Sequence, residues 1–95
     1  MSIFAVIREY SGFDHSLPLE RQALWESHRR FMNALEADGF VLLGGPLEQG
    51  RDVLLIFRAD SPEQIEQRLA EDPWTRSGFL RTARIAPWQI RIGAL

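Results

Sequence analysis

Short apolar runs alternate with stretches of helical periodicity along this chain. The runs are bounded by polar residues or glycine and cover residues 3–7, 40–43 and 53–57. Such runs, rich in β-branched and aromatic residues, predict strands, and the first strand extends to about Tyr10. Gly44-Gly45-Pro46 is expected to close the second strand as a turn, and residues 47–52 make a hairpin-sized connection to the third.

A fourth strand is predicted over residues 80–92. Its alternation changes phase near Pro87, with Ala83 and Ile85 on one face before it and Trp88 and later apolar residues on the other face after it. A bulge or an edge position near Pro87 would explain both the phase change and the proline.

From about residue 18 the apolar positions recur at helical spacing, and Gly39 is a typical stop. One face of this helix is expected to carry Leu24, His28, Phe31 and Leu35, with Trp25 and Met32 at its margin.

A second helix is predicted to start at Ser61, with Pro62 in its first turn and Gln64 at the capping-box position. It runs to about Glu71 and ends before Asp72-Pro73, because a residue that precedes proline avoids helical geometry. Residues 74–79 are expected to be short and irregular.

These elements predict one domain, 1–95, of the α+β class, in the ferredoxin-like order β-α-β-β-α-β. Its sheet is antiparallel and four-stranded, with both helices on one face. Continuous apolar strands are typical of sheets buried on both faces, but two helices cover only one face. We therefore expect a homodimer in which two sheets pack face to face in an isologous interface.

Composition narrows the possible functions. The formal net charge of −2 provides no general attraction for nucleic acid or an anionic membrane, and no apolar run approaches a bilayer span. There is no cysteine, which excludes disulfides, thiolate nucleophiles and cysteine-bound metal. All eleven basic residues are arginine, which excludes a Schiff-base or phosphate-loop lysine. A short N-terminal apolar run without a basic region before it makes the cytoplasm the expected location.

His28 places an ionisable imidazole within an apolar helix stripe, so it needs a polar partner. Asp72 is the best candidate, because both helices pack on the same sheet face and Asp72 ends the second one. A carboxylate there would fix the imidazole tautomer and make His28 a general base. Two structural alternatives remain open. In the first, His28 is a core residue that hydrogen-bonds to the backbone. In the second, which is compatible with the pair, Asp72 caps a short turn that starts at Pro73.

Three local motifs in this order resemble the YCII family of small dimeric ferredoxin-like proteins. They are the helical His28, the glycine-bounded stretch 39–46 that ends in Gly-Pro, and Asp72-Pro73-Trp74. The resemblance implies a His28–Asp72 pair lining a pocket in each subunit, and cofactor-independent chemistry on small hydroxylated or chlorinated rings. This chain differs in its short 47–52 hairpin and in having Ala86, where relatives often have a basic residue before the proline.

The resulting hypothesis is a lyase, dehydrochlorinase-like, or an isomerase that acts on a small hydroxylated ring through His28 and Asp72, without a cofactor. Aromatic walls for the ring are expected from Trp25, Phe31, Trp74 and Trp88, although tryptophans are also common in cores and interfaces. Arg76 is a candidate to hold an anionic group, unless it is simply solvated. No metal site is expected, because His15 and His28 are too few and too far apart.

Two other functions remain open. One is a non-catalytic small-molecule-binding or accessory domain with the same pocket. The other is a cofactor-free or haem-using monooxygenase of the related dimeric α+β barrels.

Overall fold

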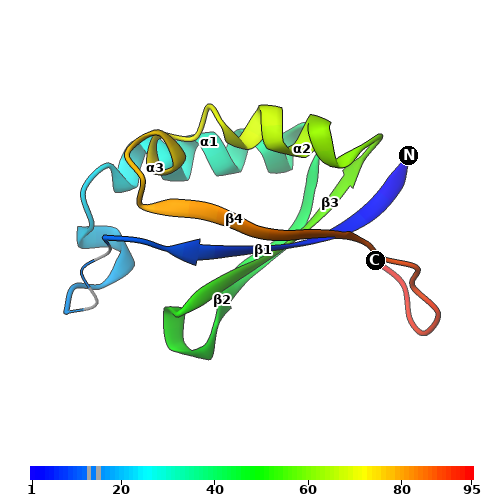
Figure 1. Ribbon diagram of the computed structural model, residues 1–95, viewed down its shortest axis with the longest axis horizontal. Helices are drawn as coiled ribbons and strands as arrows, with labels where there is room; N and C mark the ends of the chain where they lie inside the picture. Colours follow the sequence, from blue (N-terminus) through cyan, green and yellow to red (C-terminus); the bar gives the residue numbers. More distant parts are fainter. Residues whose placement is uncertain (13, 15) are drawn as a thin grey trace.

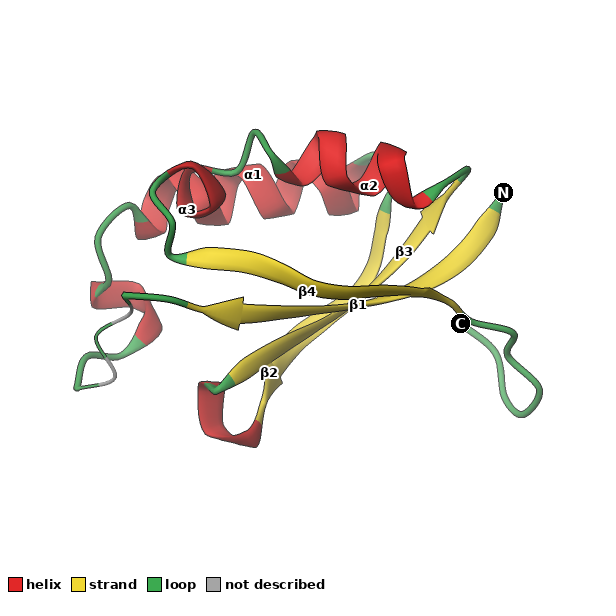
Figure 2. Cartoon of the chain, in the orientation of Figure 1, coloured by secondary structure: helices red, strands yellow, loops and turns green. Residues whose placement is uncertain are grey.

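The computed structural model describes residues 1–12, 14 and 16–95, and it has the predicted β-α-β-β-α-β order (Figure 1). The strands are β1 (Ser2–Tyr10), β2 (Val41–Leu47), β3 (Asp52–Ala59) and β4 (Leu80–Pro87). The helices are α1 (Trp25–Ala37), α2 (Pro62–Leu69) and the single-turn α3 (Pro73–Arg76), with 3₁₀ turns η1 (Leu19–Arg21) and η2 (Glu48–Gly50). The helices α1, α2 and α3 lie on one face of the sheet, as Figure 2 shows.

The four strands form one antiparallel sheet in the order β2-β3-β1-β4, which is the ferredoxin-like topology. Alternate residues of β1 face the helices, so Phe4 and Val6 enter the core and pair with Phe57 and Leu55 of β3. Arg8 continues this alternation and is buried on the same face. The inner face of β1 therefore carries a charge at the end where α3 lies.

The first helix starts later than the periodicity predicts. Residues 19–21 form a separate 3₁₀ turn, and Leu24 has a left-handed backbone (φ 63°) directly before α1. Because of this break, Leu24 is 48% exposed, and the prediction that it joins the inward stripe is wrong. Leu35 is buried as predicted, and Phe31 packs against the core.

The start of α2 is confirmed. The Ser61 hydroxyl accepts a hydrogen bond from the Gln64 backbone N–H (3.2 Å), and Pro62 occupies the first turn. The Gln64 side chain accepts from the Asp60 N–H (2.8 Å), one residue before the N–H that a capping box would use. The helix ends at Leu69, earlier than predicted, and residues 73–76 form the helical turn α3 where an irregular segment is expected.

Gly44, Gly45 and Pro46 do not close β2 but lie within it, paired with β3. At Gly44 a Cβ atom would lie 2.5 Å from Cδ2 of Leu55, so a larger residue would force this core side chain to shift. Sequence alone reads the same glycine pair as a turn, because the contact that requires it comes from another strand.

The last strand ends at Pro87, and its irregularity lies elsewhere than expected. The register with β1 shifts between Ile7 and Arg8, which leaves Ala83 as the extra residue of a bulge. The predicted edge position is confirmed, because β4 is an outer strand and so tolerates Pro87. The Trp88 N–H still donates to the Ile3 carbonyl (2.8 Å) beyond the end of the strand.

The sheet face that points away from the helices is largely apolar. It includes Ile3 and Ile7 of β1 and Leu54 of β3, with Leu43 of β2 and Trp88 among the exposed large side chains. The pattern from which we predict a second copy is therefore present, and the homodimer itself stays a prediction. No helix in the described part of the chain is long and apolar enough to cross a membrane.

Candidate functional site

Asp72 lies between α2 and α3 and is completely buried, with an exposed fraction of 0%. Its Oδ1 accepts a hydrogen bond from the Trp74 backbone N–H (3.0 Å), so it caps α3 as one of the structural alternatives expects. Pro73 in the first turn favours the same short helix. The Asp72-Pro73-Trp74 sequence thus places a carboxylate on the helix-facing side of the sheet.

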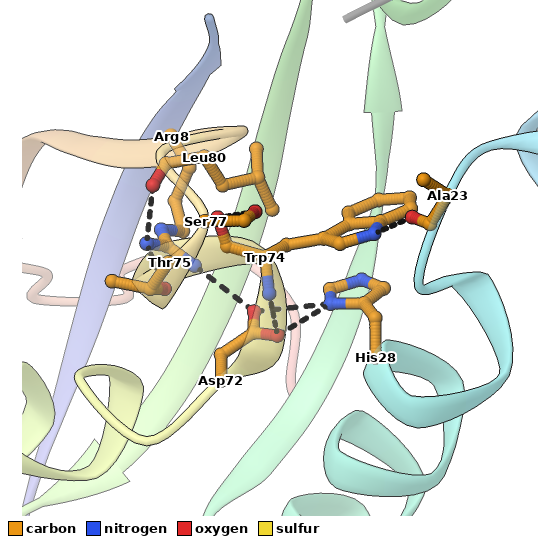
Figure 3. A network of polar contacts seen from close by, with 8 residues as sticks. All are labelled: Arg8, Ala23, His28, Asp72, Trp74, Thr75, Ser77 and Leu80. Atoms are coloured by element: carbon orange, nitrogen blue, oxygen red, sulfur yellow. Dashed lines mark hydrogen bonds and ion pairs between the residues drawn. The ribbon is translucent and has the colours of Figure 1, made fainter.

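His28 projects from the first turn of α1 onto this carboxylate. Its Nδ1 lies 2.9 Å from Oδ1 and 3.0 Å from Oδ2 of Asp72 (Figure 3). An ionised carboxylate only accepts hydrogen bonds, so Nδ1 carries a proton and donates a hydrogen bond to Asp72. In the neutral ring Nε2 is then left with a lone pair. The contact that the helix spacing predicts is present.

The ring of His28 is also held on its face. The indole of Trp74 stacks on it with ring centroids 3.9 Å apart and planes 8° apart. The Trp74 indole N–H donates to the Ala23 carbonyl (2.7 Å), which fixes the indole against the segment before α1. Trp25 lies beside both rings, with centroid distances of 6.1 Å to His28 and 5.9 Å to Trp74. Asp72 fixes the direction of the imidazole and Trp74 fixes its plane.

Arg8 is a third polar member of this cluster, and the sequence interpretation does not include it. Its Nη1 lies 3.5 Å from Oδ2 of Asp72, and its Nη2 donates to the Thr75 hydroxyl (2.8 Å) and contacts the Leu80 carbonyl at 3.5 Å. Burial lowers the pKa of Arg8, and the nearby Asp72 carboxylate opposes this change. The signal was the alternation of Phe4, Val6 and Arg8, which puts Arg8 on the inner face.

A cavity of about 320 Å³ lies beside His28, between α1 and β2. Its lining is mostly apolar and aromatic, with a few polar groups, which is typical of small-molecule sites. Burial raises the pKa of Tyr10, with a smaller opposite effect of Arg8, so its phenol keeps its proton at neutral pH. Residues that line the cavity include Arg8, Tyr10, Trp25, His28, Met32, Asn33, Glu36, Val41, Gly44, Pro46 and Trp74.

The predicted site residues fall into two groups. His28, Trp25 and Trp74 line this cavity, and Asp72 lies behind His28. Three other candidates lie elsewhere. Phe31 packs against the core, Arg76 is exposed at the end of α3, and Trp88 borders a second hollow on the open sheet face with Leu43 and Leu54.

The described residues include no group of three or more His, Cys, Asp or Glu side chains that could hold a metal ion. His15, weighed above as a metal ligand, lies outside the described residues.

Comparison with known proteins gives a family and similar solved structures. The family of YCII-related domains matches residues 4–89. The structure of 5-chloro-2-hydroxyhydroquinone dehydrochlorinase from Burkholderia phenoliruptrix AC1100, in complex with 2,5-dihydroxybenzoquinone, is similar with a TM-score of 0.64 and 18% identity. The alignment covers 96% of this chain and 95% of the dehydrochlorinase. No curated protein matches the sequence.

Proposed function

This chain belongs to the family of YCII-related domains, and on that premise we propose that it is a cofactor-independent lyase or isomerase acting on a small hydroxylated ring. His28 is the general base and Asp72 its orienting partner. The observation that carries the proposal is the hydrogen bond from His28 Nδ1 to a fully buried carboxylate. The same imidazole ring also borders a cavity. This arrangement directs the basic Nε2 away from Asp72 and fixes its orientation.

The reaction follows from that geometry. Nε2 accepts a proton from a hydroxyl group or a carbon of the bound ring. In a keto tautomer of the ring, where the leaving group is on a saturated carbon, the electron pair left behind forms a new π bond, and a leaving group such as chloride departs with its bonding pair. Asp72 stabilises the imidazolium that results, and the proton then passes to water. The dehydrochlorinase of the same fold acts on a chlorinated hydroxyhydroquinone, which supports this class of substrate.

The cavity suits a planar ring in size and lining. Trp25 and Trp74 offer aromatic surfaces, and Tyr10 and Asn33 offer polar groups on the same lining. Small-molecule sites combine such apolar walls with a few polar groups that fix orientation. We also propose that a second copy of the chain covers the open sheet face. A location in the cytoplasm stays a prediction from the sequence.

The test separates binding from turnover. Wild type and His28→Asn are mixed with 2,5-dihydroxybenzoquinone to measure binding, and with 5-chloro-2-hydroxyhydroquinone to measure chloride release. We expect His28→Asn to bind the quinone within a few-fold of wild type and to lose turnover by about 100-fold or more, since general base catalysis contributes about 10²–10⁴.

Glu63→Gln, a change at an exposed position of α2, is the control and should keep full activity. Chloride release that survives in His28→Asn would contradict the proposed role of His28. A wild-type protein that binds the quinone and turns over no hydroxylated or chlorinated ring would favour the non-catalytic binding domain instead.

A further inference from the structure

The buried Asp72 carboxylate has two neighbours that can carry positive charge, Arg8 and His28. We propose that Arg8 is a positioning residue that supplies the countercharge of Asp72, so that His28 stays neutral and its Nε2 remains free to accept a proton. This inference deepens the proposed function and rests on it, because the charge of His28 matters for chemistry only if His28 acts as the base.

Arg8 is held firmly in this place. Its side chain is 1% exposed, and its Nη2 is fixed by the Thr75 hydroxyl at 2.8 Å and the Leu80 carbonyl at 3.5 Å. Its Nε is buried without a hydrogen-bond partner among the described residues. An incompletely bonded buried guanidinium is a poor device for stability, since buried ion pairs often stabilise less than apolar residues of similar volume. This favours a functional reason for its presence.

The charges of the cluster explain what Arg8 does. With Arg8 positive and Asp72 negative, the buried pair is neutral before His28 takes up any proton. Without Arg8, the carboxylate is left uncompensated in a buried site, and an isolated buried charge is strongly unfavourable. The nearest group able to compensate it is the His28 ring, 2.9 Å away. An imidazolium carries a proton on both nitrogens and cannot act as a base.

Few other charges act on His28. Among the described residues that line the cavity, the remaining titratable groups are Tyr10 from β1 and Glu36 from α1. On the outer side of α1, Glu26 and Arg29 are exposed and pair with each other at 3.0 Å. Thr75, the partner of Arg8 in α3, carries no charge. Among the described residues that line the cavity, Arg8 is the only arginine.

The experiment reads the charge of the ring directly. Histidine labelled with ¹⁵N is incorporated into protein carrying His15→Gln, so that one imidazole remains, and its ring nitrogen shifts are recorded at pH 7.5. We expect a neutral ring with its proton on Nδ1. In Arg8→Gln we expect the ratio of imidazolium to neutral ring to rise about tenfold, because a nearby positive charge that disfavours the imidazolium is lost.

Arg8→Lys keeps the positive charge and should give a ratio close to that of wild type. Arg84→Gln, which removes an exposed charge from β4, is the matched control and should change nothing. Circular dichroism confirms that each variant is folded.

Two results would overturn the inference. One is an unchanged ratio in folded Arg8→Gln. The other needs no variant of Arg8, and is a His28 ring that is already an imidazolium at pH 8 in protein with Arg8 in place. Neither result depends on turnover, so this test can fail while the chloride-release test succeeds, and the reverse.

Discussion

At the scale of single residues, the carboxylate of Asp72 combines two compatible roles that the sequence suggests, a helix cap and a partner for His28. Its oxygens accept hydrogen bonds from the Trp74 backbone, from the His28 ring and, at a longer distance, from Arg8. One of these bonds caps a helix and the other two organise charge. A substitution at this position therefore changes both the stability of α3 and the state of the site.

The two roles of Asp72 can be separated by comparing Asp72→Asn with Asp72→Ala. Both variants leave Arg8 without its counterion, so both should be less stable than wild type. Asparagine can still accept the Trp74 N–H, whereas alanine cannot, so Asp72→Ala should lose about 1 kcal/mol more of the unfolding free energy. Urea denaturation measures the difference, with the exposed Asp60→Ala as control. Equal losses in the two variants would show that the cap contributes nothing.

The residue-level site is partly predictable from the sequence. The contact of His28 with Asp72 follows from one apolar helix stripe and one proline that ends a helix. Arg8 is missed because it follows a continuous apolar run, which does not show by itself which face of the strand is buried. The pairing of β1 with β3 and the burial of Phe4, Val6 and Arg8 show that the even-numbered positions face the helices.

At the scale of elements, β2 shows how one strand is fitted to its neighbour. Gly44 faces Leu55 so closely that a Cβ would lie 2.5 Å from Cδ2, whereas at Gly45 nothing lies within 4 Å of a Cβ. Both glycines lie in the same strand and neither has a positive φ. They are therefore a matched pair in which only the packing differs.

Gly44→Ala should lower the unfolding free energy by about 1–3 kcal/mol, because the added methyl group displaces a buried leucine side chain. Gly45→Ala should be neutral or stabilising by up to about 1 kcal/mol, since alanine restricts the unfolded chain. Thermal and urea unfolding measure both values. If Gly44→Ala were as stable as Gly45→Ala, Leu55 would move aside freely and the close approach would not explain the glycine.

Element boundaries are where sequence interpretation is weakest in this chain. Helical spacing continues through residues 18–24, yet the backbone breaks at Leu24 because that residue adopts a left-handed conformation. The bulge of β4 lies at Ala83, four residues before the proline that suggests it. Both features depend on how the segment meets its neighbours, which local periodicity does not record.

At the scale of the whole molecule, an apolar sheet face opposite the helices remains open. If a second copy covers it, a charge placed at its centre should prevent association. We expect wild type to sediment as a dimer at micromolar concentration and Leu54→Arg, on that face, to sediment as a monomer. Ala37→Arg adds the same charge to an exposed position of α1 and should remain dimeric. A monomeric wild-type protein would contradict the proposed dimer.

The architecture as a whole is the most predictable level of this protein. Four runs of β-forming residues and two capped helical segments in this order leave few other topologies. The predicted order, the antiparallel sheet and the single helical layer are all confirmed. Long, strongly patterned segments decide these features, whereas the bulge at Ala83 and the helix break at Leu24 each depend on a single contact or dihedral angle.

The cavity is lined by side chains from several elements of the fold. His28, Asp72 and Arg8 come from α1, the start of α3 and β1, while another wall is formed by the outer strand β2. If His28 acts as the base, substitutions along β2 change which ring is accepted while the cluster of His28, Asp72 and Arg8 stays as it is.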